Sequence, residues 1–175
     1  MMHKNLKLIR KIGKFDYYEY TPRITRLFYK HNEKMTLVKR IRFMLDYIRG
    51  YKVFYIMQNG EMVGYCMVTR GGSYRLKFTD GKDIVLGPAF IAESNRGQGL
   101  NGIMCGNILN EFNLNYQYAY TYIRKTNMSS IKSFEKVGFV SLSSARMSKF
   151  LKIIQLCSNS SEGNFVIHRY KNPRF

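Results

Sequence analysis

The chain of 175 residues contains no tryptophan and only three prolines and three cysteines. The cysteines, Cys66, Cys105 and Cys157, are odd in number and widely spaced, which fits neither a disulfide framework nor a zinc cluster. Long hydrophobic runs are also missing, because Lys, Arg or Asn interrupts each one before it reaches the roughly 18 residues of a membrane span. The N-terminus lacks the hydrophobic region of a signal peptide. We therefore expect a cytoplasmic protein in a reducing compartment, without a membrane span.

Acidic residues are scarce: 29 Lys and Arg stand against 11 Asp and Glu, a net charge of +18. Residues 1–52 carry +10, residues 53–112 are neutral and residues 113–175 carry +8. Such a field attracts nucleic acid, acidic membrane or phosphorylated small molecules, although scattered Lys and Arg equally serve to solvate a surface. The three histidines, His3, His31 and His168, show no metal-ligand spacing, so we expect no metal.

The first 50 residues predict two helices. Thr21 and Pro22 fit an N-cap followed by proline at the first helical position, and Ile24, Leu27 and Phe28 then share a helical face. A second helix that stops at Gly50 is indicated by five apolar residues at helical spacing, namely Leu37, Ile41, Met44, Leu45 and Ile48.

An antiparallel meander is expected next. Asn59-Gly60 tolerates the positive φ angles of a tight hairpin turn and joins the expected strands 53–58 and 61–68. Two further strands are expected at 74–78 and 83–91.

From Leu100 the apolar period changes to that of a helix, carried by Leu100, Ile103, Met104, Ile108 and Phe112. Alternating tyrosines then predict a strand over 116–123, and Asn127 caps a short helix that ends at Gly138. Closing strands are expected at 139–142 and 165–170, with 147–156 unassigned and 158–163 a polar loop. With 45% apolar and 23% charged residues, the pattern predicts one mixed α/β domain over residues 1–175.

The most informative segment is Arg96-Gly97-Gln98-Gly99-Leu100-Asn101-Gly102, between an expected strand and an expected helix. Glycine lets backbone amides approach a ligand, and a helix N-terminus adds unpaired N–H groups with partial positive charge. Together they favour a phosphate or pyrophosphate site over an empty glycine-rich turn.

Two common phosphate folds are excluded. The loop contains the spacing Gly97-x-Gly99-x-x-Gly102, but four residues, 93–96, separate the strand from the first glycine, and only 73 residues follow Gly102. A Walker loop is excluded because no Gly-Lys pair is followed by Ser or Thr.

Two motifs resemble the GNAT superfamily of acyl-CoA N-acyltransferases. Arg96-x-x-Gly99-x-Asn101 is similar to its pyrophosphate loop, Gln/Arg-x-x-Gly-x-Gly/Ala. Residues 127–139 are similar to its second motif, Asn-x-x-Ala-x-x-x-Tyr-x-Lys-x-Gly-Phe. The resemblance covers residues 20–145 and implies a single domain with a mixed, mostly antiparallel sheet of about six or seven strands and about four helices.

The resemblance also implies a binding mode for acetyl-CoA. In the family, the fourth and fifth strands splay apart and the pantetheine arm of the cofactor enters the gap. In this chain the arm would pair with the backbone of Ala89, Phe90 and Ile91. A backbone amide there would also bind the thioester oxygen. The amides of Arg96, Gly97, Gln98, Gly99, Leu100, Asn101 and Gly102 would hold the pyrophosphate. Asn127 would bind the cofactor arm, although an ordinary N-cap explains an asparagine there equally well.

Two positions depart from the family pattern. Asn101 replaces a small residue but leaves the amides available. Phe134 stands where many members carry a tyrosine thought to protonate the departing thiolate, and core packing is its favoured role. Ser130, one helical turn earlier, is then the nearest candidate hydroxyl to protonate the CoA thiolate. Because a free thiol has a pKa of about 8.5, the thiolate is also a tolerable leaving group without a proton donor.

The sequence does not clearly identify the general base that would remove a proton from the acceptor amine. A lysine-like amine of pKa about 10.4 is only about one part in a thousand neutral near neutral pH, so a base is needed. Tyr122 and Asp83 occupy positions where family members carry carboxylates, but Tyr122 also fits packing and Asp83 a solvated turn.

The leading hypothesis is an acetyl-CoA-dependent N-acetyltransferase that acts on a primary amine in a ternary complex. The basic flanks favour an acceptor of anionic character, such as a nucleotide-linked amino sugar or a nucleic-acid-associated protein. The alternatives are a nucleic-acid-binding module that uses the tyrosine-rich strand, and a family member that binds CoA without catalysis. The oligomeric state is left open.

Overall fold

The computed structural model describes residues 5–111 and 116–175, which form two compact units. Of the described residues, the first unit holds 5–69 and 87–100, and the second holds 70–86, 101–111 and 116–175. The described residues form nine strands and three α-helices, so the expectation of six or seven strands and four helices is wrong in number. None of the described helices is long and apolar enough to cross a membrane.

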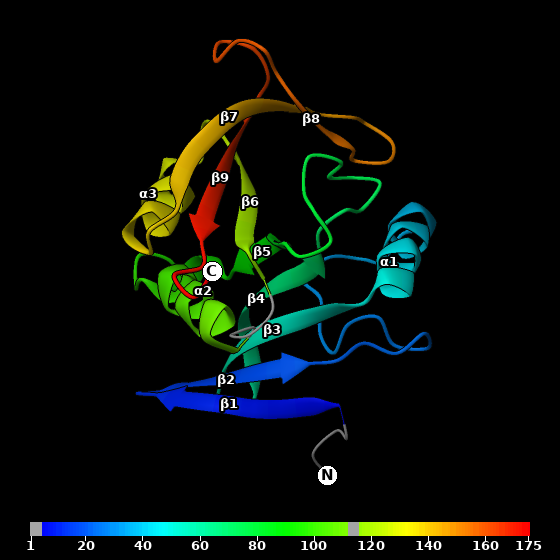
Figure 1. Cartoon of the computed structure of the whole chain (residues 1–175). Helices are drawn as coiled ribbons and strands as arrows, with labels where there is room; N and C mark the ends of the chain where they lie inside the picture. Colours follow the sequence, from blue (N-terminus) through cyan, green and yellow to red (C-terminus); the bar gives the residue numbers. More distant parts are fainter. Residues whose placement is uncertain (1–4, 112–115) are drawn as a thin grey trace. The chain divides into compact units, whose positions relative to one another are not determined.

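The first unit is built on an antiparallel meander of four strands (Figure 1). They are β1 (Leu6–Ile12), β2 (Phe15–Tyr20), β3 (Tyr51–Gln58) and β4 (Glu61–Arg70). Asn59 (φ 52°) and Gly60 (φ 79°) both adopt the left-handed region, which confirms the predicted hairpin turn. A cluster of aromatic and aliphatic side chains from β2, β3 and β4 forms the core of this unit.

The helix expected before Gly50 is confirmed as α1 (Leu37–Arg49). Thr36 caps its start by accepting a hydrogen bond from the Lys39 N–H, and Gly50 follows its end with φ 80°. The residues of α1 that are buried are Phe43 and Asp46. The apolar residues that predicted the helix therefore do not form its buried face.

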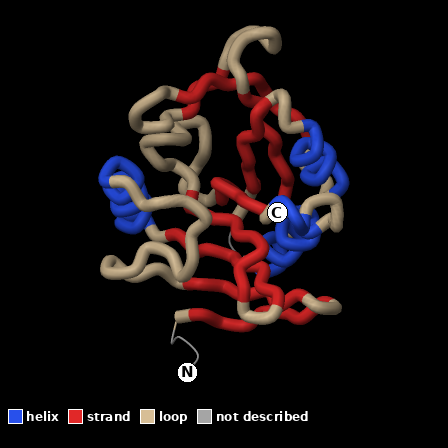
Figure 2. Tube along the Cα trace, turned by 180° about the vertical axis from the view of Figure 1, so that it is seen from behind, coloured by secondary structure: helices blue, strands red, loops and turns tan. Residues whose placement is uncertain are grey.

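The helix expected from Thr21 is wrong: residues 21–36 form a loop with a single bridge (Figure 2). Three tyrosine hydroxyls from the meander bind its backbone instead of helical partners. Tyr20 donates to the carbonyl of Arg26, Tyr51 to that of Leu27 and Tyr55 to that of Lys30. Leu27 and Phe28 are buried, so their spacing reflects packing on the sheet.

In the second unit the strand order is β5–β6–β9–β7–β8, with β5 and β6 parallel and the other pairs antiparallel. Strand β5 begins in this unit and ends in the first. The strands are β5 (Ile84–Ile91), β6 (Tyr118–Arg124), β7 (Val140–Met147), β8 (Ile154–Leu156) and β9 (Phe165–Lys171). The helices are α2 (Leu100–Glu111) and α3 (Met128–Lys136). Phe112, expected to continue α2, lies outside the described residues.

The tyrosines of β6 pack within the second unit. Tyr120 is buried, and Tyr118 and Tyr122 pack beside it on the same cluster. The Arg169 guanidinium lies 4.7 Å from the centre of the Tyr118 ring. The strand therefore offers few open ring faces for base stacking.

The strand expected at 74–78 is also wrong, because this tract turns back on itself. Leu76 N–H donates to Ser73 and Thr79 N–H donates to Leu76, while the Thr79 hydroxyl accepts from Gly72. Leu76 and Phe78 nevertheless pack into the core cluster of the second unit, which explains their apolar character.

The three cysteines are free: Cys66 and Cys105 are buried and Cys157 is half-buried. Burial raises the pKa of the Cys66 thiol to about 12. Within the described residues, no group of three His, Cys, Asp or Glu side chains is placed to hold a metal.

Candidate functional site

The end of β5 lies close against β4 within the first unit. A Cβ atom added to Gly64 would lie 2.9 Å from the carbonyl oxygen of Phe90 and 2.6 Å from Cδ1 of Ile91. Phe90 packs on Tyr65, with 6.0 Å between ring centres, whereas Ala89 is exposed. The backbone of residues 89–91, which we predict to pair with pantetheine, is thus packed against Gly64, where a side chain would collide with it.

Gly64→Ala is expected to lower acetyl-CoA affinity about tenfold, because its Cβ atom would come too close to the Phe90 carbonyl and the Ile91 side chain and would force them to shift. Isothermal titration calorimetry measures the change. Gly106→Ala is the matched control, since a Cβ atom at Gly106 meets nothing within 4 Å, and it should leave affinity unchanged. Equal affinity in the two variants would show that the Phe90 backbone does not contact the cofactor.

After β5 the chain makes a short 3₁₀ turn (Glu93–Asn95) and enters the glycine loop. Arg96 donates from Nε to the Ile91 carbonyl, which ties the loop back to the strand. Gly97 (φ 79°) and Gly99 (φ 72°) both lie in the left-handed region, and a Cβ atom on either would meet nothing within 4 Å. The loop needs glycine for its backbone angles, and no atom lies within 4 Å of where a side chain would begin at Gly97 or Gly99, so the backbone there is accessible.

Helix α2 starts directly after this loop, at Leu100. The Leu100 side chain is buried, while the N–H groups of the first turn have no acceptor within the helix. Asn101 donates to the Ser133 hydroxyl at 3.4 Å, so its side chain links α2 to α3. Gly102 has no left-handed backbone, and a Cβ atom added to it would lie 3.5 Å from Oγ of Ser133, an ordinary contact distance.

Asn127 is the N-cap of α3, as predicted. Its Oδ1 atom accepts from the Ser130 N–H at 3.2 Å and from the Ser129 hydroxyl at 3.1 Å. Its amide Nδ2 atom is therefore the group that a cofactor arm would use. Phe134 is buried and packs edge-on against Phe139, which confirms core packing as its role. The Ser130 side chain is half-buried at the start of the helix.

The two candidates for the base have structural partners in the second unit. The Tyr122 hydroxyl accepts from the Arg75 guanidinium at 3.3 Å. Asp83 is buried, not solvated as expected, and accepts from the N–H groups of Asp80 (2.7 Å) and Tyr118 (3.2 Å). Burial raises the pKa of the Asp83 carboxyl, and these two hydrogen bonds oppose the rise.

Sequence reasoning missed Gly64 and Arg75. A lone glycine inside a strand pattern signals close backbone approach, so Gly64 was detectable in principle. Arg75 lies in the tract wrongly assigned to a strand, and no local pattern indicates that it reaches Tyr122.

Comparisons with solved structures give a consistent fold. An acetyltransferase of the GNAT family from Streptococcus pneumoniae has 13% identity and a TM-score of 0.53, covering 76% of this chain and 74% of its own. The ribosomal-protein-S18-alanine N-acetyltransferase from Escherichia coli has 15% identity and a TM-score of 0.55, covering 81% and 79%. A protein described as an acetyltransferase from Salmonella typhimurium, solved with its cofactor acetyl-CoA, has 16% identity and a TM-score of 0.54, covering 77% and 70%.

No family model and no curated protein sequence matches the chain. The three-dimensional comparison thus supports the resemblance to the GNAT superfamily that the two motifs indicate. The sequence identities of 13–16% are too low for a sequence comparison to give a match. The chain has the fold of the GNAT acetyltransferases.

Proposed function

We propose that the protein is an N-acetyltransferase that moves the acetyl group of acetyl-CoA to a primary amine by direct transfer in a ternary complex. The observation that carries the proposal is the loop before α2, where Gly97 and Gly99 adopt left-handed angles with open space in front of them. The same fold occurs in a solved structure that contains acetyl-CoA. The proposal treats residues 1–175 as one catalytic domain.

Each part of the site has a distinct task in this proposal. The amides of 96–102 bind the pyrophosphate, and Asn127 contacts the cofactor arm through Nδ2. The backbone of Ala89–Ile91 at the end of β5 pairs with pantetheine, and one of its amides stabilises the oxygen of the thioester as negative charge develops.

Proton transfer is the less constrained part of the mechanism. Phe134 has no proton to donate, so the thiolate leaves unaided or receives a proton from water or Ser130. The incoming amine must lose a proton before it attacks, and Tyr122 and Asp83 remain the candidate acceptors. Their hydrogen bonds to Arg75 and to backbone N–H groups give each of them a structural role as well.

The acceptor is proposed to carry anionic character, because residues 1–52 and 113–175 hold the whole net charge of the chain. A nucleotide-linked amino sugar and the N-terminus of a nucleic-acid-associated protein both meet this condition. One structural neighbour acts on the alanine of ribosomal protein S18. A strong preference for spermidine would contradict the charge argument.

Acetyl-CoA at a hundred times its Kd is expected to raise the melting temperature by about 5–10 °C, whereas NADPH and ATP should not. Thermal unfolding measures the shift. An amine panel that contains an amino-sugar nucleotide, an alanine-initiated peptide and spermidine then tests transfer through release of free thiol.

The outcomes separate the three candidate functions. Stabilisation with thiol release supports the proposal. Stabilisation without release across the panel identifies a CoA-binding protein without catalysis, for which the buried Phe134 is the supporting observation. Salt-sensitive oligonucleotide binding without stabilisation by acetyl-CoA would favour a nucleic-acid-binding module.

A further inference from the structure

Helix α1 exposes its apolar side. Leu37, Ile41, Leu45 and Ile48 are 74%, 52%, 38% and 78% exposed, although they recur at helical spacing. At about 100° per residue their midline lies roughly half a turn from the buried residues Phe43 and Asp46. The helix is therefore amphipathic, with its apolar stripe on the side opposite to its own buried residues.

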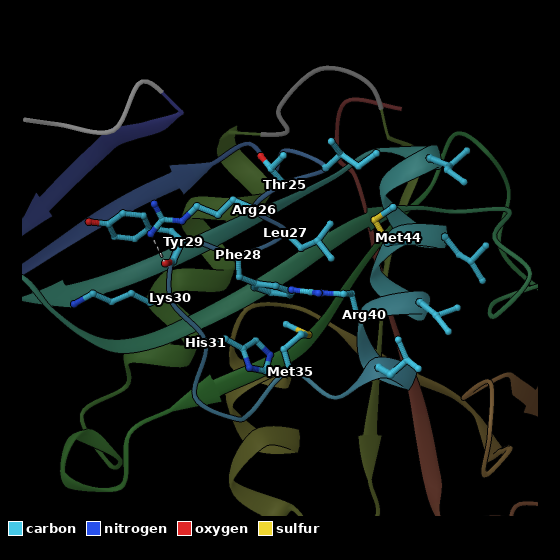
Figure 3. Close-up of a pocket in the computed structure, with 15 residues that line it drawn as sticks. Thr25, Arg26, Leu27, Phe28, Tyr29, Lys30, His31, Met35, Arg40 and Met44 are labelled. Atoms are coloured by element: carbon cyan, nitrogen blue, oxygen red, sulfur yellow. Dashed lines mark hydrogen bonds between the residues drawn. The ribbon is translucent and has the colours of Figure 1, made fainter.

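The stripe also lines one side of an open depression. A cavity of about 730 Å³ lies between α1 and residues 24–31, lined by Ile24, Leu27 and Met44 among others (Figure 3). Ile24 is itself 60% exposed. Figure 3 shows Arg40 extending from α1 over this depression. The apolar surface is thus wider than the helix alone.

Basic residues border the stripe on both sides. On the helical wheel Arg40 flanks one edge, and Arg42 and Arg49 flank the other. Residues 21–50 contain eight Lys and Arg but only two acidic residues, Glu33 and Asp46. Glu33 is paired with Lys39, and Asp46 is buried, so neither offsets the charge at the stripe. A fitting partner must be apolar at its centre and anionic at its edges.

A second copy of the chain does not meet this condition, because it would bring the same basic edges and another net charge of +18 to the contact. The exposed residues of the stripe are aliphatic, whereas the energetic centres of protein interfaces are rich in aromatic residues. An anionic bilayer places phosphates above hydrocarbon, which matches arginines beside aliphatic side chains.

We propose that α1 is a peripheral membrane anchor that lies in the plane of an anionic phospholipid bilayer. Leu37, Ile41 and Ile48 enter the boundary between headgroups and acyl chains, and Arg40 and Arg49 remain among the phosphates. The proposal does not depend on acetyl transfer, and a catalytically inert protein would dock in the same way.

Vesicle co-sedimentation tests the proposal with the full chain. We expect binding to vesicles of phosphatidylglycerol and phosphatidylcholine in equal parts, and little binding to phosphatidylcholine alone. Ile41→Gln/Ile48→Gln should lower the partition coefficient at least about tenfold, as should Arg40→Gln/Arg49→Gln. Val140→Gln/Leu142→Gln is the matched control, because it removes an exposed apolar pair from β7, and it should bind as the parent does.

The absence of tryptophan provides a second readout. Ile48→Trp introduces the only indole, whose emission should shift to shorter wavelength with the anionic vesicles, while Val140→Trp should show no shift. Unchanged thermal unfolding shows that each variant is folded.

Three results would overturn the proposal. The first is a lack of binding to anionic vesicles, and the second is binding that Ile41→Gln/Ile48→Gln does not reduce, which would indicate charge alone. The third is a concentration-dependent dimer in sedimentation velocity that this double variant abolishes, which would make a second copy the occupant.

Discussion

Gly99→Val is expected to reduce acetyl-CoA affinity about a hundredfold, equivalent to about 2.7 kcal/mol. Gly99 has φ 72°, an angle that a β-branched residue adopts only at a cost of about 1–2 kcal/mol. Relief of this strain rotates the following amides, and the valine side chain fills the open space in front of the loop. Calorimetric titration with acetyl-CoA measures the loss.

Gly13→Val is the control for backbone strain. Gly13 has φ 57° and open space around it, as Gly99 does, but lies in the turn between β1 and β2. Both variants should lose similar stability, and Gly99→Val alone should lose the cofactor. If Gly13→Val weakens binding equally, the loop before α2 is not the pyrophosphate site.

Tyr55→Phe is expected to lower the free energy of unfolding by about 3 kcal/mol, because one hydroxyl serves several backbone groups of the loop at 21–36. It donates to the Lys30 carbonyl at 2.9 Å and accepts from the N–H groups of Tyr29 (3.1 Å) and Lys30 (3.4 Å). Phenylalanine leaves these groups without that partner in a half-buried environment. Urea denaturation followed by circular dichroism measures the loss.

Tyr47→Phe removes the same atom from a half-buried tyrosine of α1, for whose hydroxyl no hydrogen bond is recorded within residues 5–111 and 116–175. Its effect should stay below about 0.5 kcal/mol. Comparable losses in the two variants would mean that the loop does not depend on the Tyr55 hydroxyl.

Local backbone chemistry was predictable from the sequence. The Asn59-Gly60 turn, the Asn127 cap and the end of α1 at Gly50 each follow from the angles or hydrogen bonds that one or two residues prefer. The glycine loop belongs to the same class, since left-handed angles at Gly97 and Gly99 are a property of the residue type. These features lie within a few residues of the atoms that determine them.

Features that depend on distant partners were not predictable. Residues 21–28 have a helical apolar period, but tyrosines of β2 and β3 donate to the carbonyls of Arg26 and Leu27 in a loop. Periodicity identified α1 without showing which of its sides is buried, because Phe43 lies off the apolar stripe. The partners of Asp83 and Tyr122 likewise come from other segments, so their roles could not be read from spacing.

The proposed acetyl transfer can be tested in the native protein with a disulfide reagent at low background. Such reagents react with the thiolate, and two of the three cysteine thiols of the chain, those of Cys66 and Cys105, are buried and so shielded from them. Burial also raises the pKa of the Cys66 thiol to about 12, so the folded protein carries almost no thiolate there at neutral pH. Cys157 is the remaining thiol, so we expect a background of about one equivalent per chain, and the proposed reaction would add coenzyme thiol beyond it.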